Sequence, residues 1–268
     1  TEGAAMMMTS TIRIQRREEI SDMCRKLFLS QQLVALCQQA TPRQEEFLHD
    51  VLSMEVESRE RSKRSRLLNR ARFPMPKSME GYDYSHVRLP PSITRVELEG
   101  CEFIGRKTNL VCYGPVGTGK THMAIALGMK ACEMGLAARF YTVTELVLKL
   151  AEARKNGVLE RLVSDIRRLD LLILDEWGYV PVDKEGSQLL FRIISDSYES
   201  KSLIVTTNLE FSKWGGIFTD QQMAAAMIDR LIHHGHLLVF EGPSYRMEHA
   251  LMRKTASERS KGGDEHGR

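Results

Sequence analysis

A glycine-rich loop that ends in a lysine and a threonine is the segment of this chain best suited to chemistry. It reads G-x-x-x-x-G-K-T, and the motif with its flanking residue comprises Gly114, Pro115, Val116, Gly117, Thr118, Gly119, Lys120, Thr121 and His122. In such loops backbone N–H groups surround phosphates, the lysine reaches the β and γ phosphates, and the threonine hydroxyl binds Mg²⁺. A glycine-rich turn with an incidental lysine is the alternative. Because an apolar strand precedes the loop and a helical segment follows it, the sequence favours a nucleotide site.

Two acidic residues end a second apolar strand, Leu171 to Leu174. Asp175 is placed to hold Mg²⁺ together with Thr121, and Glu176 to orient or deprotonate an attacking water. The alternative interpretation is a solvated strand end. It is less favoured because the glycine-rich loop is present in the same chain. The second acid favours hydrolysis of the nucleotide.

Asn208 follows a third apolar strand and is the remaining candidate for the reaction. Its amide can position the water or contact the γ-phosphate. An asparagine in this position is more often a turn residue, because its side chain bonds its own backbone. Only the two preceding motifs make a catalytic role the better interpretation.

These motifs require a sheet that presents several strand ends at one edge. Five short β-rich runs alternate with helical periodicity: 109–113, 139–143, 171–174, 203–207 and 237–240. Their apolar character predicts a five-stranded parallel sheet covered by helices on both faces, a three-layer α/β fold. Only 28 residues follow Phe240, so we expect no helical lid after the sheet.

The region before the sheet is helical in pattern. Thr41 and Pro42 predict a helix start, and Phe73 and Pro74 predict where the helical region ends. We divide the chain into an added or disordered start (1–8), a helical domain (9–73), a proline-containing connector (74–91), the α/β domain (92–250) and a charged tail (251–268).

Composition limits the classes of function. The net charge is +3, and the five cysteines show no C-x-x-C pairing, which favours reduced thiols over disulfides or zinc. No apolar run is long enough to cross a membrane and no secretory signal is recognisable. We therefore expect a cytoplasmic protein without a membrane partner.

Basic residues cluster locally. On a helix, Arg59, Lys63, Arg66 and Arg70 form one stripe, which can follow a phosphate backbone without reading bases. A second candidate DNA-binding group comprises Lys149, Arg154 and Lys155. A solvated basic helix face is the alternative for both. We read His233, His234 and His236 as structural residues.

The motifs together resemble the AAA+ ATPases, and more narrowly the IstB/DnaC-like family. The resemblance rests on residues 114–122, on Leu174 to Pro181 (LDEWGYVP), on Thr206 to Asn208 with Trp214, on Ala226 to His234 (AMIDRLIHH), and on Gly242 to Arg246 (GPSYR). The Asp-Glu-Trp-Gly-Tyr and Asp-Arg-Leu-Ile-His-His segments favour IstB, the ATPase helper of insertion-sequence transposition, over the helicase loaders. Ser197 stands where a basic residue is expected, so no role is transferred to it.

The resemblance implies further residues and partners. It implies that ATP is the nucleotide, that Arg230 acts as an arginine finger on a neighbouring subunit's ATP, and that Arg246 senses nucleotide. It also implies a homo-oligomer with nucleotide at subunit interfaces, which assembles on and remodels duplex target DNA and regulates the IstA transposase.

Three alternatives remain at this point. A DnaC-like replicative helicase loader shares the ATPase motifs and prefers single-stranded DNA. A P-loop kinase has no use for Glu176 and Asn208 as a water-positioning pair. The third alternative is a nucleotide-gated scaffold without catalysis. It is distinguished by whether Glu176→Gln traps an ATP-dependent assembly that the wild type dissolves.

Overall fold

The computed structural model describes residues 2–179, 182–218 and 220–248, and the chain divides into two compact units between Arg66 and Leu67. The predicted tail, 251–268, lies outside the described residues.

The first unit is helical. It contains α1 (Glu2–Lys26), α2 (Gln31–Gln38) and most of α3 (Pro42–Ala71), which crosses into the second unit. Ser30 caps α2 by accepting a bond from the Leu33 N–H at 3.4 Å. Apolar side chains of the three helices, together with Leu27 directly after α1, form a small core: Ile20, Met23, Cys24, Leu27, Cys37 and Leu52. Because α1 begins at Glu2, residues 2–8 of the predicted added or disordered start belong to a helix.

A buried carboxylate fastens α1 to the beginning of α3. Glu45 has no exposed surface, and it accepts bonds from Arg13 at 2.9 Å and 3.1 Å and from Arg17 Nε at 2.6 Å. These guanidinium groups, Arg13 first, lower the pKa of Glu45 to about 2. The carboxylate therefore stays ionised and paired inside the unit.

The second unit is built on one mixed sheet. Its strands are β1 (Val87–Arg88), β2 (Asn109–Tyr113), β3 (Ala138–Thr142), β4 (Leu171–Trp177), β5 (Ser202–Thr207) and β6 (Gly235–Phe240). The order is β1-β6-β2-β5-β4-β3, and all pairs are parallel except β1 with β6. This order places β5 between the strand that precedes the glycine-rich loop and the strand that carries Asp175 and Glu176 near its end.

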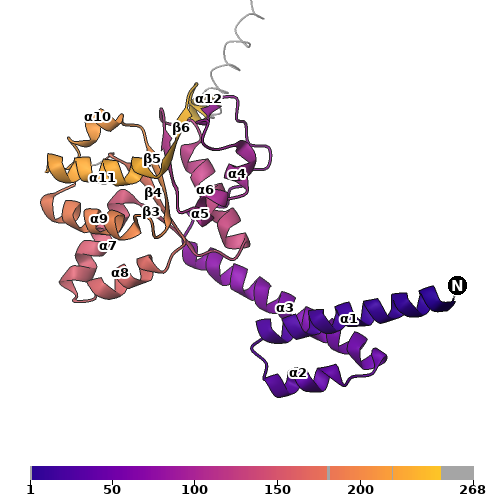
Figure 1. Ribbon diagram of the computed structural model, residues 1–268. Helices are drawn as coiled ribbons and strands as arrows, with labels where there is room; N and C mark the ends of the chain where they lie inside the picture. The colour runs from indigo at the N-terminus through magenta and orange to yellow at the C-terminus, as the bar shows by residue number, and fades with distance from the viewer. Residues whose placement is uncertain (1, 180–181, 219, 249–268) are drawn as a thin grey trace, which may run out of the picture. The chain divides into compact units, whose positions relative to one another are not determined.

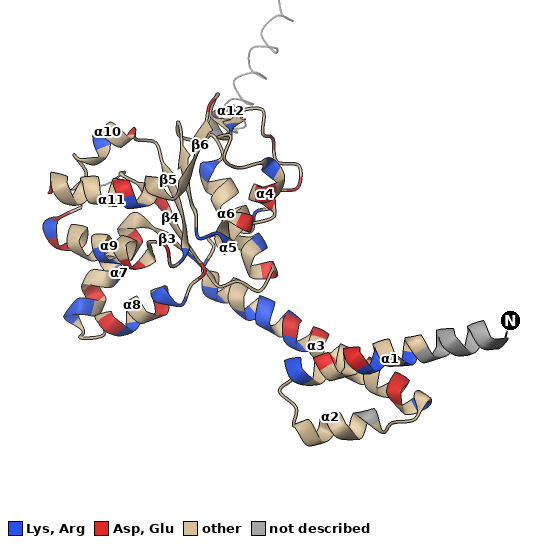
Figure 2. Ribbon diagram, viewed as in Figure 1, with Lys and Arg blue, Asp and Glu red and all other residues tan. Residues whose placement is uncertain are grey.

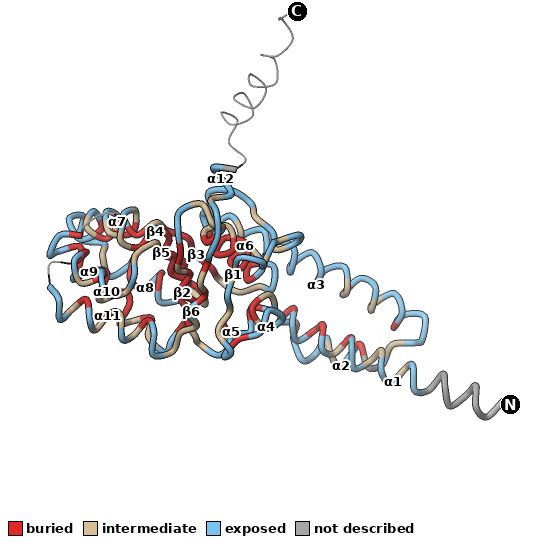
Figure 3. The backbone as a smooth tube through the Cα atoms, turned by 90° about the horizontal axis from the view of Figure 1, so that it is seen from above, coloured by how far each residue is buried: buried red, intermediate tan, exposed pale blue. Residues whose placement is uncertain are grey.

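Helices cover both faces of this sheet (Figure 1). One layer contains α4 (Arg95–Glu99), α5 (Glu102–Gly105) and α6 (Lys120–Glu133). The other contains α7 (Val143–Lys155), α8 (Leu159–Arg167), α9 (Lys184–Ser197), α10 (Phe211–Trp214) and α11 (Gln221–His233), and the short α12 (Tyr245–Glu248) follows β6. Burial is concentrated on the central strands (Figure 3). The predicted three-layer α/β fold is confirmed.

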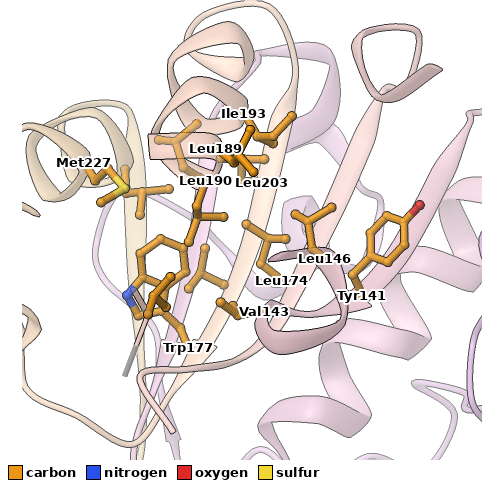
Figure 4. Close-up of a cluster of buried hydrophobic side chains, with 14 of the residues drawn as sticks. Tyr141, Val143, Leu146, Leu174, Trp177, Leu189, Leu190, Ile193, Leu203 and Met227 are labelled. Carbon is orange, nitrogen blue, oxygen red and sulfur yellow. The ribbon is translucent and has the colours of Figure 1, made fainter. Parts of the chain in front are cut away.

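Each face of the sheet has its own apolar core. On the α7 and α9 face, Trp177, at the end of β4, packs against Trp214 with ring centroids 5.0 Å apart, within a cluster that includes Leu190 and Met227 (Figure 4). On the α6 face, Leu110, Leu127 and Ile173 belong to a second cluster. The two tryptophans of the chain lie in the second unit.

The predicted strand count needs one correction. A sixth strand, β1, lies in the segment that we interpreted as a connector, where two residues pair antiparallel with Phe240 and Val239 of β6. Two residues among prolines carry no periodicity, so only the pairing with β6 defines this strand. The five cysteines are all buried. Within the described ranges, no helix has both the length and the apolar character to cross a membrane.

Candidate nucleotide-binding site

The loop between β2 and α6 contains three glycines with unusual backbone angles. Gly114, Gly117 and Gly119 have φ of +153°, +84° and +96°, which L side chains rarely adopt. A Cβ atom at Gly114 would lie 2.1 Å from the carbonyl oxygen of Phe240, and one at Gly117 would lie 2.0 Å from Oγ of Ser244. The loop is therefore bare backbone at these three positions, the form in which N–H groups can surround a phosphate.

Lys120 is the first residue of α6, and the loop closes around its side chain. It is 7% exposed, and its Nζ donates to the carbonyl oxygens of Gly114 at 2.7 Å and Pro115 at 2.6 Å. No side chain of the described residues caps α6 at Gly119, and the first N–H groups of a helix have no partner within it. An amine and a helix amino end together favour an anion such as a nucleotide phosphate.

Thr121 and Asp175 bring two oxygen donors together beside this loop. Thr121 Oγ1 donates to Oδ1 of Asp175 at 2.9 Å and lies 3.2 Å from Oδ2. Asp175 is 4% exposed and also accepts a bond from the Thr206 hydroxyl of β5. A hydroxyl and a carboxylate next to a phosphate loop are the donor types that Mg²⁺ takes, so the predicted metal residues fit this ion.

Glu176 leaves the regular path of β4. Its φ is +62° and its side chain is exposed, whereas Asp175 before it and Trp177 after it are buried. The register of β4 with β5 shifts between Leu174 and Trp177, which is a bulge. The bulge keeps the carboxylate of Glu176 out of the core, at the strand end that carries Asp175.

Asn208 follows β5, between the loop and Glu176. Thr207, which precedes it, accepts a bond at its carbonyl oxygen from the Gly114 N–H at 3.2 Å. The Oδ1 atom of Asn208 is buried and has no hydrogen-bond partner among the described residues. A buried acceptor without a partner is uncommon in folded proteins, and Asn208 follows the strand that lies between the loop-bearing strand β2 and the Glu176-bearing strand β4.

Comparison with known proteins assigns the family. A profile of the IstB-like ATP binding protein family matches residues 23–253. The chain belongs to this family. It is 37% identical over 226 residues to a protein of insertion sequence IS21 from Pseudomonas aeruginosa, covering 82% of this chain and 84% of that one. It is 33% identical over 240 residues to a protein of insertion sequence IS5376 from Geobacillus stearothermophilus, covering 86% and 94%.

Solved structures show the same fold for this IstB-like chain. The DnaC helicase loader matches with a TM-score of 0.50 at 20% identity, covering 66% of this chain and 99% of that one. DnaI matches with a TM-score of 0.52 at 16% identity, covering 63% and 96%. The second unit therefore has the AAA+ fold, as the motifs predict.

Arg230 lies away from the other candidate residues of this IstB-like chain. Its Nη1 donates to Ala226 O at 2.9 Å, and its Cζ lies 5.1 Å from the ring centroid of Phe191. Its carbonyl oxygen lies 3.4 Å from Nδ2 of Asn109, at the start of β2, whereas the loop follows the end of that strand. A five-residue strand spans about 15 Å, so Arg230 does not approach the loop of its own chain.

Two predicted nucleotide residues have other surroundings. His122 places Nε2 at 2.9 Å from the carbonyl oxygen of Ser78 and its ring at 5.3 Å from that of Tyr82. It thus faces the segment before the sheet rather than Lys120. Arg246 belongs to α12, where the Tyr245 N–H donates to Gly117 O at 3.0 Å, but its side chain lies outside the described part.

Sequence reasoning missed the contribution of the connector to this site. Tyr82 donates to the Gly119 carbonyl oxygen at 3.4 Å and lies 2.8 Å from where a Cβ of Gly119 would be. Its burial raises the pKa of the phenol, so it stays a neutral donor. The aromatic residues between the connector's prolines were the available signal, but we assigned the whole stretch 74–91 to a connector.

The candidate DNA-binding residues of α3 lie on a continuous helix whose later half is rich in Lys and Arg (Figure 2). All four are exposed. Arg59 pairs with Glu55 at 2.7 Å, and Arg66 bonds the Ser62 carbonyl oxygen at 3.3 Å. Their spacing continues that of Leu48, Leu52 and Val56, which pack into the first unit's core. The predicted stripe therefore exists as an exposed row of cations.

In the second basic group, on α7, a larger share of the cations pairs with acidic side chains than on α3. Lys149 pairs with Glu145 at 2.6 Å and lies over the Tyr141 ring, and Arg154 pairs with Glu185 at 3.1 Å. Lys155 is exposed. Two of its three cations thus have acidic partners, which makes this group the weaker candidate for phosphate contacts.

Proposed function

We propose that this chain is a Mg²⁺-dependent ATPase. The observation that carries this proposal is the bond between Thr121 and Asp175, which joins the phosphate loop to the strand end that bears Glu176. Binding alone needs the loop, whereas Glu176 and the unpartnered amide oxygen of Asn208 add groups that can act on water.

Each residue then has a separate task. Lys120, which now bonds two loop carbonyls, exchanges them for phosphate oxygens. Asn208 accepts a hydrogen bond from the attacking water, and Glu176 accepts its proton as the water oxygen bonds the γ-phosphorus and the bond to the ADP oxygen breaks. Mg²⁺, held through Thr121 and Asp175, would neutralise charge on the phosphate oxygens.

The test is phosphate release by the purified chain and by Glu176→Gln. We expect the variant to bind ATP like the wild type while kcat falls by about 10² or more, the usual contribution of a positioned base. Glu152→Gln, an exposed glutamate on α7, is the matched control. Equal kcat for wild type and Glu176→Gln would refute this role.

We also propose that hydrolysis depends on assembly, with Arg230 supplied by a neighbouring subunit. The support is its place near the start of β2, about a strand length from its own loop. A guanidinium supplied across an interface stabilises charge in the transition state.

The proposed biological setting is insertion-sequence transposition. Support comes from the family and from the relatives in IS21 and IS5376. We propose that the ATP-bound oligomer grips and remodels duplex target DNA through α3 and regulates the element's transposase, IstA. Sedimentation with an ATP analogue tests the first part: assembly on duplex DNA supports the proposal, and preference for single strands indicates a helicase loader.

A further inference from the structure

The bulge at Glu176 leaves two residues of β4 opposite one residue of β5. Leu174 pairs with Val205 and Trp177 pairs with Thr207, so Asp175 and Glu176 together face Thr206. The register shift removes regular ladder bonds at this point. Something else must hold Glu176 at a φ of +62°, a conformation that costs energy for a residue with a side chain.

The Thr206 side chain makes two hydrogen bonds at the bulge. Its hydroxyl accepts a bond from the Glu176 N–H at 3.1 Å and donates to Oδ1 of Asp175. The side chain is 2% exposed, so water does not readily substitute for the hydroxyl. One hydroxyl therefore connects the backbone of the proposed base with the carboxylate of the proposed metal ligand.

We propose that Thr206 is a positioning residue for hydrolysis: its hydroxyl orients Asp175 and Glu176 relative to each other and to the γ-phosphate. This inference rests on the proposed ATPase function. Residues that hold a metal ligand or a base from behind commonly change activity by about 10- to 100-fold when they are replaced.

The variants separate the hydroxyl from the shape of the side chain. Thr206→Val keeps the branched shape and removes both bonds, whereas Thr206→Ser keeps the hydroxyl. Ser202→Ala is the control for weakening β5, because Ser202 is a buried residue of the same strand whose hydroxyl bonds Phe103 O at 3.1 Å, away from the site. Thermal unfolding followed by tryptophan emission measures the loss of stability in each.

We expect Thr206→Val to lower kcat about 10- to 100-fold, with little change in KM for ATP and a higher Mg²⁺ requirement. Thr206→Ser should restore most of the rate, and Ser202→Ala should turn over like the wild type. A wild-type kcat for Thr206→Val, or Thr206→Ser as slow as the valine variant, would overturn the inference.

A second measurement separates this inference from the ATPase proposal. If the wild type releases no phosphate, the ATPase proposal fails. Binding of a fluorescent ADP analogue with and without Mg²⁺ then tests whether Thr206 positions Asp175. Thr206→Val should lose part of the Mg²⁺-dependent gain in affinity that the wild type and Thr206→Ser keep. An equal gain in all three would overturn the positioning role.

Discussion

The hydroxyl of Thr121 lies 2.9 Å from Oδ1 of Asp175, although 54 residues separate them in the chain. Thr121 is the second residue of α6, and Asp175 is near the end of β4. The contact exists because β2 and β4 are parallel strands with only β5 between them, so their carboxyl ends meet at one edge of the sheet.

This pair predicts the metal dependence of nucleotide binding. Thr121→Val removes one oxygen donor and Asp175→Asn removes the charge, so both should reduce the gain in ATP affinity that Mg²⁺ provides. Thr121→Ser should behave like the wild type because it keeps the hydroxyl. Titration of a fluorescent ATP analogue with and without Mg²⁺ measures the gain, and an unchanged gain in Asp175→Asn would contradict the assignment.

Much of this architecture is predictable from the chain alone. The five parallel strands are short apolar runs between helical segments, and burial on both faces makes such runs recognisable. The loop, Asp175 and Glu176 follow from local order, because strand, loop and helix are consecutive. The residues that support them were not predictable in the same way.

Those supporting residues depend on contacts between distant segments. Thr206 is 30 positions from Glu176, whose backbone it bonds, and nothing in the sequence of β5 separates it from the next threonine. Tyr82 belongs to a proline-containing stretch without periodicity, and β1 is two residues long. In each case the fold alone brings the partners together, so local patterns carry no signal.

Mixing two inactive variants tests the proposed action of Arg230 across an interface. Arg230→Ala lacks the finger but keeps Glu176, and Glu176→Gln keeps the finger but lacks the base. In a mixed oligomer, a Glu176→Gln subunit can donate its arginine to the intact site of an Arg230→Ala subunit. We expect each variant alone to be slow and the mixture to regain phosphate release.

The control for this mixture is Arg106→Ala, because Arg106 is an exposed arginine paired with Glu97 and Glu102. It should hydrolyse ATP like the wild type. A mixture no faster than the average of its two parts would exclude action in trans.

Salt dependence tests the stripe on α3. Replacing Arg59, Lys63, Arg66 and Arg70 by glutamine should weaken duplex binding without regard to sequence, and the slope of log affinity against log salt should fall by up to about 4 units. The same change at Lys149, Arg154 and Lys155 should have less effect, because two of these side chains already pair with acids. Fluorescence anisotropy with labelled duplex measures the affinity of both variants. A salt slope for the α3 variant equal to that of the wild type would reject α3 as the DNA-binding element.

Glu45 predicts acid sensitivity of the first unit. Its folded pKa of about 2 lies below its ordinary value of 4.5, so the folded state binds fewer protons in this range. The stabilisation is fully present above pH 4.5 and is lost as pH falls towards 2. At neutral pH, Glu45→Gln should cost about 2 kcal/mol of unfolding free energy, and Glu46→Gln, its exposed neighbour, should cost little.

Helical circular dichroism and tryptophan emission separate the two units in that experiment. Both tryptophans lie in the second unit, so Glu45→Gln should shift the dichroism transition more than the emission transition. Equal stability of Glu45→Gln and Glu46→Gln at neutral pH would show that the two arginines do not stabilise the carboxylate.

Lys201 predicts a second pH dependence of stability, in the alkaline range. It is 2% exposed and directly precedes β5, and its amine bonds the carbonyl oxygen of Ile166. Burial lowers its pKa to about 8 from an ordinary 10.5, so between these values the unfolded chain binds more protons, and the contribution of Lys201 to stability rises with pH. Below pH 8 the amine is charged in the folded protein, and burial of this charge lowers the free energy of unfolding by its full amount.

The difference in unfolding free energy between Lys201→Met and the wild type should therefore move in the wild type's favour by about 2 kcal/mol from pH 7 to pH 10. Urea unfolding of both proteins across this range measures the difference, which cancels titration of the cysteines and tyrosines that both share. A difference independent of pH would show that the amine titrates in the folded protein as it does in the unfolded chain.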